Sequence, residues 1–72
     1  MREDVIIYFE KFYEIKGVDT SDSQAYFDTE SWWVSNYGFQ KYTSLQSFFV
    51  MKYRYLRFIQ RRANENRNKG KI

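Results

Sequence analysis

The sequence predicts an all-α protein, a compact three-helix bundle, and three kinds of observation support that prediction. Apolar residues recur at intervals of three and four in three segments, as they do on one face of an α-helix. Capping boxes precede the second and third segments, and a glycine follows the first and the second. We expect helices over about residues 4–16, 22–36 and 44–64, in a single domain of residues 1–65. Residues 66–72 are polar and basic, which predicts a disordered tail.

The first predicted helix, about residues 4–16, depends on the period of its apolar residues. These recur at intervals of three, four and three: Val5, Tyr8, Phe12 and Ile15. The run of residues 5–9 alone also fits a β-strand, but the helical period continues to Ile15 and therefore favours a helix. Gly17 then supplies a helix stop.

Two capping boxes fix the expected starts of the second and third helices. The Ser21 hydroxyl can accept a hydrogen bond from the amide three residues on, while Gln24 reaches back to the cap. Thr43 and Gln46 repeat this pattern before the third helix. Between the two, Gly38 is free to take the left-handed conformation that ends many helices.

A helical wheel divides the third predicted helix into two faces. The core face is expected to hold Leu45, Phe48, Phe49, Tyr55, Leu56, Ile59 and Ala63. The opposite side carries what we call the basic stripe: Val50, Arg54, Arg57 and Arg61, at intervals of four, three and four. Lys52 falls within the apolar face, where its ammonium either reaches solvent beside a packed stem or pairs with a carboxylate of the first half. Phe58 has no comfortable place on the core face.

Charge is divided unequally along the chain. Residues 1–36 carry eight carboxylates and three cations, whereas residues 37–72 carry one carboxylate, Glu65, and nine cations. The halves therefore sum to −5 and +8, which together give the formal net charge of +3. Such a division indicates contact with nucleic acid or a membrane, or an acidic surface that meets a basic one.

The composition also argues against several classes of protein. The sequence has no cysteine or histidine, which excludes disulfides, the usual zinc sites and Cys or His nucleophiles. No pair of carboxylates accompanies a nucleophile or a phosphate-binding loop, so we expect no enzyme activity, no metal site and no cofactor. No apolar run approaches the roughly 20 residues that span a bilayer, and no signal peptide is evident. We therefore expect a cytoplasmic (intracellular) protein without a membrane partner.

Residues 31–48 contain a pattern of apolar residues around a turn glycine. Val34 stands four positions before that glycine, Phe39 follows it, and Leu45 and Phe48 are three apart in the next helix. This pattern resembles a helix-turn-helix DNA-binding domain. The resemblance implies that the third helix enters the major groove of DNA with its first residues near base edges. Those residues are Thr43, Ser44, Gln46, Ser47 and Val50. The phosphates would be contacted by Lys41, Arg54, Arg57 and Arg61. The implied function is nucleic-acid binding, as in a phage or plasmid regulator.

A second interpretation is a small protein-interaction module, such as a phage-type adaptor or inhibitor. Its basic and aromatic third helix would grip an acidic partner surface, including that of a second copy in a homo-oligomer, because arginine and aromatic residues dominate interface hot spots. A third interpretation is binding of RNA or single-stranded nucleic acid through exposed rings and arginines. The charged residues of the third predicted helix are almost all basic, since Glu65 is the sole acid after Glu30. Solvated helices ordinarily mix acids with bases, so this excess of cations favours a binding surface.

Overall fold

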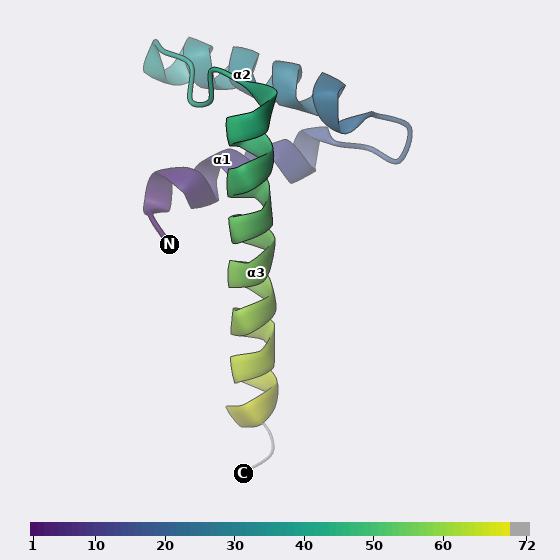
Figure 1. Ribbon diagram of the computed structural model, residues 1–72, viewed down its shortest axis with the longest axis vertical. Helices are drawn as coiled ribbons and strands as arrows, with labels where there is room; N and C mark the ends of the chain where they lie inside the picture. Colours follow the sequence, from purple (N-terminus) through teal and green to yellow (C-terminus); the bar gives the residue numbers. More distant parts are fainter. Residues whose placement is uncertain (70–72) are drawn as a thin grey trace.

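The protein folds into three helices, as Figure 1 shows for a computed structural model. The structure describes the backbone of residues 1–69 and the side chains of residues 1–65. The helices are α1 (Glu3–Ile15), α2 (Asp22–Tyr37) and α3 (Leu45–Lys69), and no strand occurs among residues 1–69. The predicted all-α, three-helix fold is therefore confirmed. The side chains of the whole predicted tail, residues 66–72, and the backbone of residues 70–72 lie outside the described residues.

The helices are arranged like the letter T: α1 and α2 together form the part that we call the crossbar, and α3 forms the stem. Both α1 and α2 cross the first half of α3, and the second half of α3 extends away from them, as Figure 1 shows. The molecule consequently measures 45 × 27 × 21 Å along its principal axes. The backbone of α3 stays helical to Lys69, five residues beyond the expected end near residue 64.

Local hydrogen bonds explain where the helices begin and end. Ser21 caps α2 as expected, because its Oγ accepts from the Gln24 amide at 3.1 Å. Gly38 ends α2 in the left-handed conformation at φ 83°, also as expected. The prediction that Thr43 caps α3 is wrong: Ser44 directly precedes the first helical turn, and its Oγ accepts from the Ser47 amide at 3.2 Å. The capping pair is therefore displaced by one residue.

Aromatic rings form most of the core. The buried apolar residues are Val5, Tyr8, Phe9, Phe12, Ala25, Tyr26, Trp33, Tyr42, Phe48 and Tyr55. Phe48 of α3 has no exposed surface, and its ring centroid lies 5.0 Å from those of both Phe12 of α1 and Tyr26 of α2. Edge-on and tilted ring pairs of this kind add about 0.5–1.5 kcal/mol each beyond the burial of apolar area. All three helices are thus joined through one side chain of α3.

The predicted core face of α3 is wrong beyond Tyr55. Leu56 and Ile59 are 41% and 42% exposed, and Ala63 is also exposed. The reason is geometric, because α1 and α2 cross the first half of α3 and leave this face of the second half without a covering helix. Phe58, which the wheel left without a place, is half-buried, and the Arg62 guanidinium carbon lies 5.5 Å from its ring centroid.

Candidate functional site on the free half of α3

The basic stripe lies on the exposed side of α3. Its members Val50, Arg54, Arg57 and Arg61 are all exposed, and they extend over about 16 Å of helix at 1.5 Å per residue. The three arginines line one open hollow of about 310 Å³, together with Met1 and Phe58. Helical spacing and this shared hollow bring them to one surface, as the sequence predicted.

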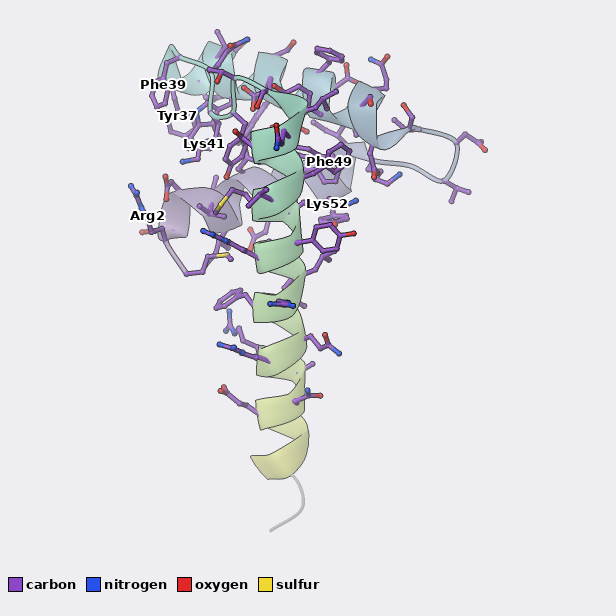
Figure 2. All side chains as sticks on the ribbon, viewed as in Figure 1. Arg2, Tyr37, Phe39, Lys41, Phe49 and Lys52 are labelled. Carbon is purple, nitrogen blue, oxygen red and sulfur yellow. The ribbon has the colours of Figure 1, made fainter. Side chains whose placement is uncertain are left out.

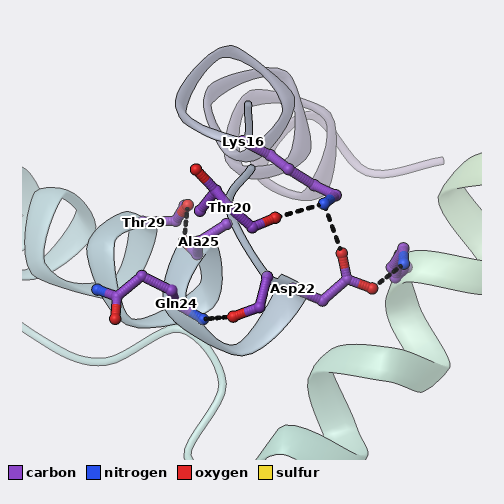
Figure 3. A network of polar contacts seen from close by, with 8 residues as sticks. Lys16, Thr20, Asp22, Gln24, Ala25 and Thr29 are labelled. Atoms are coloured by element: carbon purple, nitrogen blue, oxygen red, sulfur yellow. Dashed lines mark hydrogen bonds and ion pairs between the residues drawn. The ribbon is translucent and has the colours of Figure 1, made fainter. Parts of the chain in front are cut away.

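The lysines of the folded part have carboxylate partners. Lys11 Nζ lies 3.2 Å from Glu14 Oε1 in α1. Asp22, at the start of α2, binds Lys16 Nζ at 3.2 Å and Lys52 Nζ at 2.8 Å, and Figure 3 shows this junction between the three helices. The hydrogen bond from Lys52 holds the pKa of Asp22 below its ordinary value, with Lys16 acting in the same direction. Lys52 is therefore a structural residue that pairs with the acidic half of the chain.

Lys41 does not join the basic stripe. Its ammonium forms an ion pair with Asp4 of α1, and only 15% of its side chain is exposed. The hydrogen bond from Lys41 lowers the pKa of Asp4. In Figure 2, Lys41 lies near Tyr37 and Phe39, away from Lys52 on the other side of α3. Lys41, which the sequence predicted as a phosphate contact, is thus a structural residue that joins the connection between α2 and α3 to α1.

The arginines of α3 differ from the lysines in their partners. Within residues 1–65, no carboxylate lies within ion-pair distance of Arg54, Arg57, Arg61 or Arg62. Arg54 makes only a long contact from Nη1 to Met51 Sδ, at 3.9 Å. The sequence-based site omitted Arg62, although its position four residues after Phe58 is the spacing at which helical side chains meet. Four guanidinium groups on one free helical segment are therefore available to an external anion.

The first turn of α3 continues the same surface toward the crossbar. The predicted base-contacting residues Thr43, Ser44, Gln46 and Ser47 are all exposed. Two of them are occupied by capping, since the Ser44 hydroxyl accepts from the Ser47 amide and donates to Ser47 Oγ at 3.1 Å. Thr43 and Gln46 remain open to solvent. By helical spacing, Gln46 and Ser47 lie on the same side of α3 as the basic stripe.

A buried carboxylate holds the connection between α2 and α3 in place. Glu30 is 5% exposed, and its oxygens accept from the backbone amides of Lys41 at 3.0 Å and Tyr42 at 3.3 Å. This connection, residues 38–44, is longer than the three or four residues usual in a helix-turn-helix. The helix-turn-helix resemblance therefore stays a prediction. Glu30 holds residues 41 and 42 against α2, just before α3 begins.

Comparisons with protein-family models, with characterised proteins and with solved structures find no match for this chain. Across residues 1–69, no helix is long and apolar enough to cross a membrane. Within the same described residues, no group of three or more acidic side chains gathers as metal ligands would. Any functional assignment must consequently be argued from the geometry of α3.

Proposed function

We propose that this protein binds nucleic acid, in the first place duplex DNA, through the basic stripe of α3, which begins at Val50 and continues onto the free half of the helix. The observation that carries the proposal is the contrast between cations: the lysines of the folded part are ion-paired, whereas the α3 arginines have no carboxylate partner within residues 1–65. Arginine suits phosphate better than lysine does, because its planar guanidinium presents a rigid fork of donors. The stripe concentrates three such forks within about two turns of helix.

The shape of the molecule favours contact within a groove. A helix with its side chains is about 10–12 Å wide, and the major groove of B-DNA is about 12 Å wide. Because α1 and α2 cover only the first half of α3, the second half can approach a duplex without a neighbouring helix in the way. Arg54, Arg57 and Arg61 would contact phosphates and supply affinity without sequence preference.

Sequence preference, on this proposal, comes from the first half of the same surface. Gln46 can pair with adenine, and Val50 can touch a thymine methyl group. The Ser47 oxygen accepts from Ser44, so this side chain keeps its hydroxyl proton for donation to a base. Thr43 and Ser44 lie beside them, and Lys41 takes no part because Asp4 holds it. As in a small regulator, contact to phosphates would position the protein and the few contacts to bases would choose the site.

The test compares two double variants that lower the formal net charge of +3 by the same two units. Arg57→Gln/Arg61→Gln removes two members of the stripe, whereas Arg2→Gln/Lys11→Gln removes two cations that are paired with Asp4 and Glu14. Binding to a generic duplex is measured by fluorescence anisotropy over a series of salt concentrations. Each lost phosphate contact removes about 0.9 from the slope of log K against log salt, so the stripe variant should lose about 1.8 and the control close to nothing. Failure of the unaltered protein to bind duplex DNA at low salt, or equal losses in both variants, would refute the proposal.

An acidic protein surface is the second candidate partner, and exposed rings of the crossbar favour it. Phe27 and Phe39 are each 58% exposed, and aromatic side chains are enriched at the centres of protein interfaces. The same variants separate the candidates. If duplex DNA does not bind at low salt but polyglutamate does, and Arg57→Gln/Arg61→Gln loses that binding, an acidic protein surface is the partner.

A further inference from the structure

The free half of α3 carries a second surface that the nucleic-acid proposal does not use. Leu56, Ile59 and Ala63 follow at intervals of three and four, and we call them the apolar face of α3. At 100° per residue this face lies nearly opposite the basic stripe. Leu56 and Ile59 leave 41% and 42% of their surface exposed, so two branched apolar side chains meet solvent on one side of a protruding helix.

This segment also has little to keep it helical. No residue of α3 after Tyr55 is buried within the described side chains. An isolated helix shorter than about 12–15 residues is marginal in water, because most helical stability in proteins comes from packing of an amphipathic face. The segment from residue 56 to 69 falls in that range. Burial of its apolar face against another helix would supply the missing stabilisation.

Two hollows border the apolar face and show what could cover it. One, of about 270 Å³, lies beside Phe49, Tyr53 and Leu56. The other, of about 360 Å³, lies in the corner between α1 and α3, where Ile6 and Ile59 provide apolar walls. Glu10 and Arg62 line that corner as well. Neither has an ion-pair partner within residues 1–65, so the corner offers one free acid and one free base.

We propose that the apolar face binds the same face of a second copy, with the two α3 helices antiparallel. The spacing of three and four continues the seam of an antiparallel helix pair, in which Leu56 of each copy meets Ile59 of the other. A parallel pair would bring the two crossbars, each much wider than a helix, to the same end of the stem. An antiparallel pair separates them, and it carries the end of each stem into the corner between α1 and α3 of the other copy.

Charge complementarity supports this choice of partner. In the antiparallel pair, Arg62 of each copy approaches Glu10 of the other, and two-fold symmetry makes this contact twice. The acidic first half of one chain thereby meets the basic second half of the other. The basic stripes face outward on opposite sides of the pair, so association leaves them open and does not depend on the proposed nucleic-acid binding.

Sedimentation equilibrium from micromolar to millimolar protein tests the association itself. We expect a reversible monomer–dimer equilibrium, which Ile59→Asp should weaken at least tenfold. Val34→Asp is the matched control, because Val34 is 40% exposed on α2 and lines neither of the two hollows beside the apolar face, so it should leave the equilibrium unchanged. A single monomeric species at all concentrations, or equal weakening by both substitutions, would overturn the proposal.

Charge reversal tests the pairing between copies. Glu10→Arg alone and Arg62→Glu alone should each weaken the dimer, whereas an equimolar mixture of the two should form a heterodimer at least as stable as the original, because both contacts are then restored. A mixture that behaves as the sum of its components would refute the contact.

Cysteine cross-linking tests the orientation, and it is straightforward because the chain has no cysteine. Leu56→Cys/Ile59→Cys should form a covalent dimer on mild oxidation, and Ala63→Cys alone should not. Efficient cross-linking of Ala63→Cys alone would indicate a parallel pair and overturn the proposed arrangement.

Discussion

Replacing Glu30 by alanine should remove a large part of the stability of this protein. The carboxylate is 5% exposed and accepts hydrogen bonds from two backbone amides, of Lys41 and of Tyr42. Hydrogen bonds to a charged group contribute about 1.5–3 kcal/mol each, and alanine would also leave two buried donors unpaired. Since the bond to Tyr42 is long, at 3.3 Å, we expect a loss of about 3–4 kcal/mol. A chain of this length has a total stability of roughly 4–11 kcal/mol.

Urea unfolding followed by circular dichroism measures this loss. Glu30→Gln keeps one acceptor but turns an amide N–H₂ toward the other backbone donor, so we expect an intermediate loss of about 2 kcal/mol. Glu14→Ala is the control, because Glu14 is exposed and pairs only with Lys11 on the surface; its cost should stay within about 0.5 kcal/mol. The reasoning fails if Glu30→Ala costs no more than Glu14→Ala.

Three further outcomes are expected. Burial raises the pKa of Tyr42 to about 12, above the ordinary value of 10.0. The contribution of neutral Tyr42 to the free energy of unfolding should therefore be fully present below pH 10 and be lost as the pH rises through about 12. The helical circular dichroism signal measures this decline. The hydrogen bond from Lys52 lowers the pKa of Asp22. The stability that the ionised Asp22 contributes is therefore present above the ordinary pKa of 3.8 and disappears as the pH falls through the folded-state pKa. Asp22→Asn should accordingly flatten the fall of urea midpoints below pH 4. Gly38→Ala should cost about 1–2 kcal/mol in thermal melts, because φ is 83° and the added Cβ would meet nothing within 4 Å, which leaves backbone strain as the cause.

The number and order of the helices could be predicted from the sequence, because each helix carries its own periodicity and punctuation. The period through Ile15 and the caps at Ser21 and Gly38 depend on residues close together in the chain. The start of α3 was harder to place, since Thr43 and Ser44 are both good N-cap residues and stand side by side. Only the backbone geometry selects Ser44.

The extent of the core could not be read from a helical wheel. The wheel shows which residues share a face of α3. It places Leu56 and Ile59 on the same face as Phe48, and it does not show which of them another helix covers. Whether that face is covered depends on the crossing angle and the length of the neighbours. At 1.5 Å per residue, α1 is about 20 Å long and α3 about 38 Å, so even side-by-side packing would leave part of α3 uncovered, and a crossing leaves more.

Within residues 1–65 the lysines form ion pairs and the arginines of α3 do not, and this difference depends on tertiary structure. It also explains the charge asymmetry of the chain. Lys41 and Lys52 belong to the basic half in sequence, yet Asp4 and Asp22 of the acidic half neutralise them across helix interfaces. The asymmetry therefore serves two purposes. Part of it joins α3 to α1 and α2 through these ion pairs. The remainder is carried by arginines of α3 that form no ion pair within residues 1–65. The exposed stripe keeps its positive charge because the acids that neutralise Lys41 and Lys52 belong to α1 and α2.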